Sequence, residues 1–141
     1  MTGSGVPQSR LILGSSIAET RRLHAWLDQV FAAASPTDRL ENAIRLCLEE
    51  AVMNVIAHGY ATKAGEIEVV LLREPGGYCA QVTDTAPPFD PVAAPLPPTS
   101  RPSLQAGPIG GRGLGLMRQF ATSIRYERTG GKNRLTMRFA D

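Results

Sequence analysis

The chain has 141 residues, of which 43% are hydrophobic and 20% are charged, and its formal net charge is +2. A chain of this length can bury one ordinary hydrophobic core, so we expect a single domain. The charge is spread along the sequence and not gathered into basic runs, which argues against direct nucleic-acid binding. The two cysteines, Cys47 and Cys79, have no metal-type spacing and are expected to be reduced core residues. Without a membrane-spanning apolar run or a signal-peptide pattern, we expect a cytoplasmic protein that does not contact the membrane.

The first part of the chain predicts a loose terminus, a short strand and an amphipathic helix. Residues 1–9 are small and polar, and we expect them to be flexible. Residues 10–13 are expected to form a short strand. Apolar side chains then recur at helical spacing, and the core-facing stripe of this first helix is Leu23, Trp26, Leu27, Val30 and Phe31. The break at residues 35–38, Ser-Pro-Thr-Asp, supplies capping residues for a second helix.

The second predicted helix contains the most informative stretch, residues 50–60. Its core-facing stripe is Leu40, Ile44, Cys47, Leu48, Ala51, Val52 and Val55, and Gly59 is placed to end it. Glu50 and Asn54 fall off this stripe, and a spacing of four residues stacks them on one helical face. A carboxylate that can accept a proton, beside an amide oxygen that can hold a hard cation, suits phosphoryl transfer from a magnesium nucleotide. Taken alone, the pair is more simply a solvated polar flank.

Two β-hairpins are predicted further along the chain. Residues 67–71 alternate in hydrophobicity, Gly76-Gly77 makes a turn, and residues 78–83 return as the partner strand. The second hairpin turns at Gly130-Gly131, with alternating residues on both sides. Strands and helices that lack a βαβ rhythm predict an α+β domain over residues 10–141. We expect a two-layer α/β sandwich whose mixed, mostly antiparallel sheet carries helices on one face.

Between these hairpins lie a proline-rich segment and a glycine-rich one. Residues 87–108 hold most of the prolines and few large apolar side chains, so we expect a mobile connection. Only about thirty residues follow it, which favours a lid over an interdomain linker. Residues 110–115 let the backbone approach oxyanions, and a helix that begins near Leu114 would direct free N–H groups at a phosphate. Alone, this stretch would be a flexible loop with a helix cap.

Three motifs therefore follow one another in order. They are Glu50-Ala-Val-Met-Asn54 with His-Gly-Tyr at 58–60, Asp84 with Pro-Phe-Asp-Pro at 88–91, and Gly-Gly-Arg-Gly-Leu-Gly at 110–115. This order resembles the Bergerat ATP-binding fold shared by DNA gyrase, the heat-shock chaperones, histidine kinases and mismatch-repair ATPases. Within that superfamily, the chain is most similar to the small anti-sigma-factor serine kinases of bacterial partner-switching systems. The resemblance covers nearly the whole chain, and the ordered motifs together are far more specific than each one singly.

The resemblance implies a site for ATP and Mg²⁺. Glu50 would be the catalytic base, and Asn54 would hold the Mg²⁺ ion. Asp84 would recognise adenine, because a carboxylate accepts a hydrogen bond from its exocyclic amine, whereas guanine presents an oxygen there. A lid at about residues 87–111 would fold over the nucleotide. The remaining nucleotide-binding residues would be Gly111, Arg112, Gly113, Leu114 and Gly115.

The chain departs from the superfamily at two positions. Ala86 stands where relatives usually have glycine, so the backbone there cannot adopt a positive φ cheaply. Relatives often place a threonine of the last strand beside the adenine. Strict alternation turns Thr136 away from the core, so we do not assign that role to it.

Three other residues have competing interpretations. Glu49 is a rival to Glu50 as the base, and Glu50 is preferred because it lies four residues before Asn54. His58 is more simply a residue that interacts with the helix dipole than a phosphate ligand. His24 is interpreted as a helix-surface residue and not as a phosphoacceptor.

The resemblance implies an ATP-dependent protein serine kinase. It would phosphorylate an anti-anti-sigma factor, a small STAS-domain protein, and it would bind and inhibit a sigma factor as a homodimer. The alternative is a non-catalytic ATP-binding module whose pocket controls partner binding. Incubation with labelled ATP and a candidate partner separates these two functions.

Overall fold

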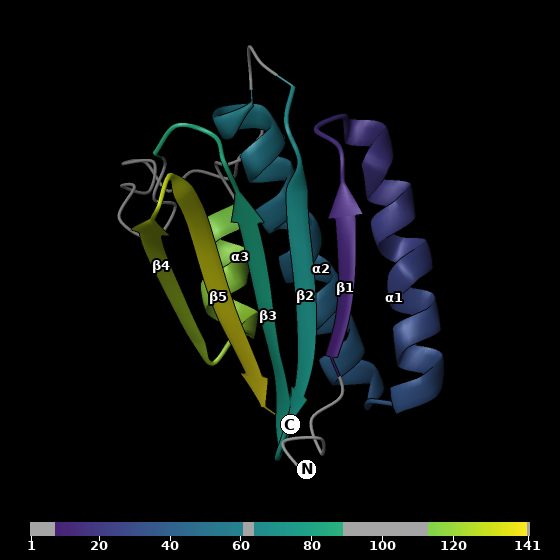
Figure 1. Cartoon of the computed structure of the whole chain (residues 1–141). Helices are drawn as coiled ribbons and strands as arrows, with labels where there is room; N and C mark the ends of the chain where they lie inside the picture. Colours follow the sequence, from purple (N-terminus) through teal and green to yellow (C-terminus); the bar gives the residue numbers. More distant parts are fainter. Residues whose placement is uncertain (1–7, 61–63, 89–112, 141) are drawn as a thin grey trace.

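The computed structural model describes residues 8–60, 64–88 and 113–140, which form a sheet with helices on one face (Figure 1). The strands are β1 (Gln8–Leu13), β2 (Ile67–Glu74), β3 (Gly77–Asp84), β4 (Ser123–Thr129) and β5 (Lys132–Ala140). The helices are α1 (Thr20–Ala34), α2 (Asp38–Asn54) and α3 (Gly113–Phe120). The strand order is β1-β2-β3-β5-β4, and every neighbouring pair is antiparallel. The predicted α+β sandwich is confirmed, and no parallel pair occurs among the described strands.

The two long helices form where their periodicity and caps predict. A left-handed residue, Ser35 (φ 52°), ends α1, and the side chain of Thr37 accepts a hydrogen bond from Leu40 N at 3.2 Å to begin α2. Strand β1 starts at Gln8, so it includes the end of the segment expected to be flexible. No helix in the described part of the chain has both the length and the apolar composition to cross a membrane.

The hydrophobic core lies between the helices and one face of the sheet. The alternation predicted for the last strand is confirmed, because Leu135, Met137 and Phe139 are buried and pair with buried residues of β3. Thr136 points to the opposite face, as expected, and pairs with Gln81. From the helices, the largest fully buried side chains of this core are Leu23, Leu27, Ile44, Leu48, Val52 and Met117.

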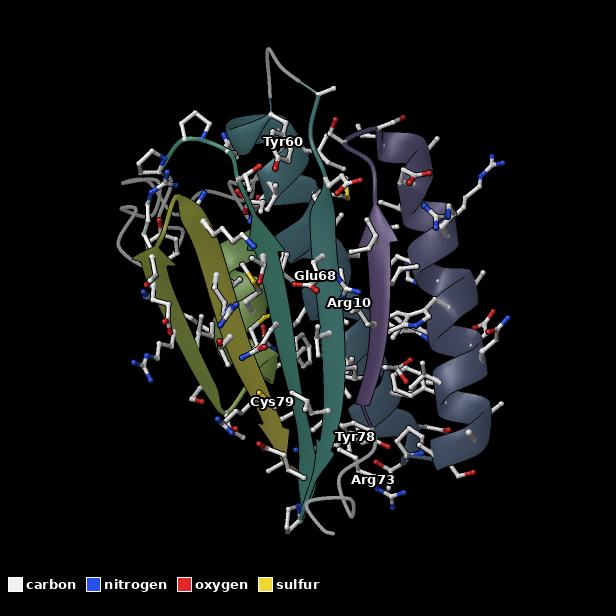
Figure 2. The ribbon with its side chains drawn as sticks, viewed as in Figure 1. Arg10, Tyr60, Glu68, Arg73, Tyr78 and Cys79 are labelled. Atoms are coloured by element: carbon white, nitrogen blue, oxygen red, sulfur yellow. The ribbon has the colours of Figure 1, made fainter. Side chains whose placement is uncertain are left out.

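No described helix covers the other face of the sheet (Figure 1). Ion pairs lie across it, including Arg10 with Glu68 (Figure 2) and Arg138 with Glu74 at 2.7 Å. Cys79 also belongs to this face and is buried among such side chains. Long charged side chains thus shield the smaller ones in place of a second layer of helices.

The turn between β4 and β5 fixes the register in which these two strands pair, and so the position of Asn133. Gly130 (φ 60°) and Gly131 (φ 78°) both adopt positive φ, as a two-residue hairpin turn requires. The turn pairs Arg128 with Asn133, and the β3–β5 ladder pairs Asn133 with Asp84. The side chain of Asn133 therefore lies on the helix-covered face, opposite Asp84.

Candidate functional site

The described parts of the three sequence motifs lie toward one end of the molecule. Asp84 is the last residue of β3 and pairs with Asn133 at the start of β5. The other end of the sheet receives the end of α3, because Thr122 N donates to Arg138 O at 2.7 Å just after that helix. Helix α3 therefore begins near the Asp84 end, and it packs against α2 (Figure 1). The end of α2, the end of β3 and the start of α3 surround one region.

Asn54 is the last residue of α2 and is more buried than its place off the apolar stripe suggested. Its side chain is 5% exposed, and its Oδ1 atom is buried without a hydrogen-bond partner. Among the described residues, no other buried side-chain nitrogen or oxygen atom lacks a hydrogen-bond partner. A buried acceptor without a donor costs about 1–3 kcal/mol, so an amide retained here suits a ligand that binds its oxygen.

Glu50 lies one helical turn before Asn54 and is half-buried. Its carboxylate lies near the thiol of Cys47. Burial, and to a smaller extent the negative charge of Glu50, raise the pKa of this thiol to about 12. Glu50 and Asn54 thus occupy successive turns of one helix, as their spacing predicted.

Glu49, the other candidate for the catalytic base, contacts a side chain of α1. Its Oε1 atom lies 2.6 Å from His24 Nε2 on α1, and Arg45 Nη1 lies 3.2 Å from His24 Nδ1. His24 is therefore not a plain surface residue, because it is half-buried in the contact between α1 and α2. The sequence did not reveal this contact, since it depends on how the two helices pack.

A π-helical turn, Val55–Gly59, follows Asn54 directly. It closes through a hydrogen bond from Tyr60 N to Val55 O at 2.9 Å. The helical segment ends at Gly59, as predicted, but the widened turn was not predicted. Such turns are rare in proteins as a whole, but many of those that occur lie at functional sites. His58 is exposed in this last turn, and its interaction with the helix dipole stays a prediction.

Tyr60 links the end of this turn to the end of β3 (Figure 2). Its hydroxyl donates to Glu66 O at 2.9 Å and accepts from Thr85 N at 2.9 Å. The ring is 8% exposed, so these bonds are shielded from water. Tyr60 thereby holds the residue after Asp84 against the segment that carries Asn54, a role that sequence reasoning did not assign.

Asp84 is 6% exposed and faces the helices. Its Oδ1 atom accepts from Ala86 N at 2.9 Å and from Asn133 Nδ2 at 2.8 Å. Its Oδ2 atom forms no hydrogen bond with the described residues, so one carboxylate oxygen is held while the other can serve a ligand. Ala86 fits this loop without a positive φ, because Ser35 is the one described non-glycine residue in that region. The departure from glycine at this position therefore introduces no backbone strain.

Asn133 was missed by sequence reasoning, which looked for a threonine on the last strand. The signal was present, because alternation continues from Leu135 back to Asn133 and places both on the buried face. Asn133 is 5% exposed and contacts Asp84 directly.

The glycine-rich motif is described only in part. Helix α3 begins at Gly113, which confirms a helix start near Leu114. Gly115 is exposed, and a Cβ atom there would meet nothing within 4 Å. Gly111, Arg112 and residues 89–110 of the expected lid lie outside the described residues.

The donor set suits Mg²⁺ better than a metal held by protein alone. The described residues include no group of three or more His, Cys, Asp or Glu side chains that could hold a metal ion. Mg²⁺ usually takes one or two protein oxygens together with substrate phosphates and water. The unpartnered amide oxygen of Asn54 fits that pattern, because it is a neutral hard ligand with no competing hydrogen bond.

Comparisons with known proteins show the family of the chain. The family model of the histidine kinase-like ATPase domain matches residues 14–139. The chain is 31% identical over 113 residues to serine/threonine-protein kinase BtrW of Bordetella bronchiseptica, covering 79% of each chain. It is 29% identical over 99 residues to anti-sigma F factor of Clostridium acetobutylicum, covering 69% of this chain and 67% of that protein.

A solved structure supports the fold. It is that of the RsbU and RsbW domains of Rv1364c from Mycobacterium tuberculosis, which matches with a TM-score of 0.68 at 20% identity. The match covers 95% of this chain and 32% of that longer one, so the likeness is to one part of it. Because the family model spans most of the chain, the chain belongs to the family of histidine kinase-like ATPase domains.

Proposed function

We propose that this chain is an ATP-dependent protein serine kinase of a partner-switching system. It phosphorylates a serine of an anti-anti-sigma factor with a STAS domain, and it binds and inhibits a sigma factor in the cytoplasm as a homodimer. The observation that carries the proposal is the buried, unpartnered Asn54 Oδ1 one helical turn from Glu50, within a histidine kinase-like ATPase domain. The names of the two relatives, a serine/threonine-protein kinase and an anti-sigma factor, support this choice among ATPases.

Each side chain has a stated task in this proposal. Asn54 would hold Mg²⁺ through its amide oxygen, and the ion would supply positive charge that stabilises the charge developing during transfer. Glu50 orients the serine hydroxyl and accepts its proton. Asp84 Oδ2 accepts a hydrogen bond from the adenine amine. The phosphates bind at the start of α3, which presents unpaired backbone N–H groups, together with Gly111, Arg112, Gly113, Leu114 and Gly115.

The proposal is tested by binding first and by transfer second. Titration calorimetry of the purified chain should show Mg·ATP binding with a clear preference over Mg·GTP. Asp84→Asn, which keeps the shape but changes an acceptor into a donor, should lose about 1–3 kcal/mol of ATP binding free energy. Absence of ATP binding by the parent chain would refute the proposed site.

Transfer is measured with labelled ATP and STAS-domain proteins of the same genome. Label should appear on one partner and be lost when that partner's acceptor serine is changed to alanine. Tight ATP binding without transfer to any STAS protein would instead support a non-catalytic module that controls partner binding.

A further inference from the structure

Asn133 occupies the centre of a hydrogen-bond network beside Asp84. Its Nδ2 atom lies 2.8 Å from Asp84 Oδ1, 3.1 Å from Ala86 O and 3.2 Å from Pro87 O. All three are acceptors, and an amide nitrogen carries two hydrogens. The same group therefore serves both the Asp84 carboxylate and the backbone that leaves β3.

The amide oxygen of Asn133 also has hydrogen-bond partners. Its Oδ1 atom accepts from Tyr126 Oη at 2.5 Å and from Arg128 Nη1 at 2.9 Å. Arg128 can only donate, so the amide cannot be turned around without placing hydrogens against a guanidinium. Arg128 Nη1 also donates to Ala86 O at 2.9 Å. The orientation of Asn133 is thus set by β4, and its hydrogens face Asp84.

We propose that Asn133 is a positioning residue that sets the preference for adenine nucleotides by fixing the Asp84 carboxylate. The inference rests on the nucleotide site proposed above. With Ala86 N and Asn133 Nδ2 both donating to Oδ1, the carboxylate is held against rotation. Its Oδ2 atom is then presented as an acceptor in one fixed direction, where it favours a purine amine and repels a purine carbonyl oxygen.

Without the Asn133 donor, the carboxylate has one held contact fewer and can rotate about its terminal torsion, which is intrinsically broad. Rotation would let water or other donors satisfy it, so discrimination between ATP and GTP would fall. The effect differs from a general loss of binding, because contacts to ribose and phosphates do not depend on Asn133.

A matched pair of variants isolates the donor. The threonine and valine side chains have nearly the same shape. The variants Asn133→Thr and Asn133→Val therefore differ mainly in the threonine hydroxyl, which can donate a hydrogen bond to Asp84. The ratio of the GTP and ATP dissociation constants, measured by calorimetry with Mg²⁺, should fall about tenfold or more in the valine variant and less in the threonine variant. Thr136→Ala lies three residues along β5 on the opposite face and should keep the parent ratio.

A double-variant cycle shows whether Asn133 acts through Asp84. If it does, Asn133→Val combined with Asp84→Asn should discriminate no worse than Asp84→Asn alone. Independent, additive losses would overturn the positioning role. Melting curves establish that each variant folds, and Asn133→Ala, which also lacks a donor, replaces the valine variant if that one does not.

The outcomes separate the two proposals. A parent chain that binds ATP and GTP equally well would refute base recognition by Asp84, and the Asn133 role with it. A parent chain that prefers ATP, with an unchanged ratio in Asn133→Val, would overturn the Asn133 inference alone and leave the proposed kinase function intact.

Discussion

His24 Nε2 lies 2.6 Å from Glu49 Oε1, so the first of two adjacent glutamates in α2 is tied to α1. Successive residues of a helix point in directions about 100° apart, and Glu50 therefore faces away from this contact. Glu50 instead lies on the face of Asn54, one turn earlier. Two side chains of identical chemistry thus occupy neighbouring positions with different surroundings, and each is a control for the other.

Glu50→Gln is expected to bind Mg·ATP within a few-fold of the parent chain while phosphoryl transfer falls by roughly 10²-fold or more, because a positioned base is lost. Glu49→Gln should leave transfer near the parent rate, since that side chain belongs to the contact between α1 and α2. Calorimetry gives the affinities, and a labelled-ATP assay with the STAS partner gives the rates. Equal transfer by parent and Glu50→Gln would remove Glu50 from the mechanism.

Asn54→Leu should stabilise the protein without nucleotide and abolish its magnesium-dependent ATP binding. The substitution removes a buried oxygen that has no partner and keeps the branching of the side chain, so the free energy of unfolding should rise by about 1–3 kcal/mol. Urea unfolding of the unliganded chain and calorimetry with and without Mg²⁺ measure the two effects. A destabilised variant with parent-like Mg·ATP affinity would contradict the metal assignment.

The parts of the fold that depend on local sequence were predictable. Helical periodicity placed Glu50 and Asn54 on one face of the helix, and Gly130-Gly131 predicted a tight hairpin turn. These signals need no knowledge of distant residues. The start of α2 followed from the capping residue Thr37, and the end of its helical segment followed from Gly59.

The features that escaped prediction depend on pairing between distant segments. Asn133 meets Asp84 through the register of two strands that are not consecutive in the chain. His24 meets Glu49 through the packing of two helices, and Tyr60 reaches Thr85 across the end of the sheet. The burial of Asn54 also follows from packing, since its polarity alone predicts exposure.

The thiol of Cys47 should make stability fall in alkaline solution. Burial raises its pKa to about 12 in the folded chain, against an ordinary value of 9.0. The unfolded chain therefore loses this proton first, so the contribution is present below pH 9.0 and is lost as pH rises toward about 12. The decline from this group approaches about 1.4 kcal/mol per pH unit.

Cys47→Ala isolates that contribution, since other groups titrate equally in both proteins. The variant should be less stable near neutral pH because of the cavity, yet lose less stability between about pH 8 and pH 10.5. Urea unfolding across this range, in the presence of a reductant, gives both slopes. Parallel slopes would mean that the thiol ionises alike in the folded and unfolded chain.

Gly65→Ala should damage both stability and nucleotide binding through Tyr60. A Cβ atom at Gly65 would lie 2.4 Å from Tyr60 Cε1 and Cζ, so the ring would have to shift. The ring cannot shift freely, because its hydroxyl is bonded to Glu66 O and Thr85 N. We expect a loss of about 1–3 kcal/mol in the free energy of unfolding and weaker ATP binding, since Thr85 adjoins Asp84.

The control is Gly14→Ala, whose Cβ atom would meet Glu19 at 3.5 Å, an ordinary contact, and should leave stability near that of the parent. If the Gly65 effect acts through the ring, it should nearly vanish in a Tyr60→Ala background, where the clashing atoms are gone. Urea unfolding of the four proteins in this cycle measures the coupling. Purely additive losses would show that Gly65 acts on its own backbone and that Tyr60 does not transmit its position to Asp84.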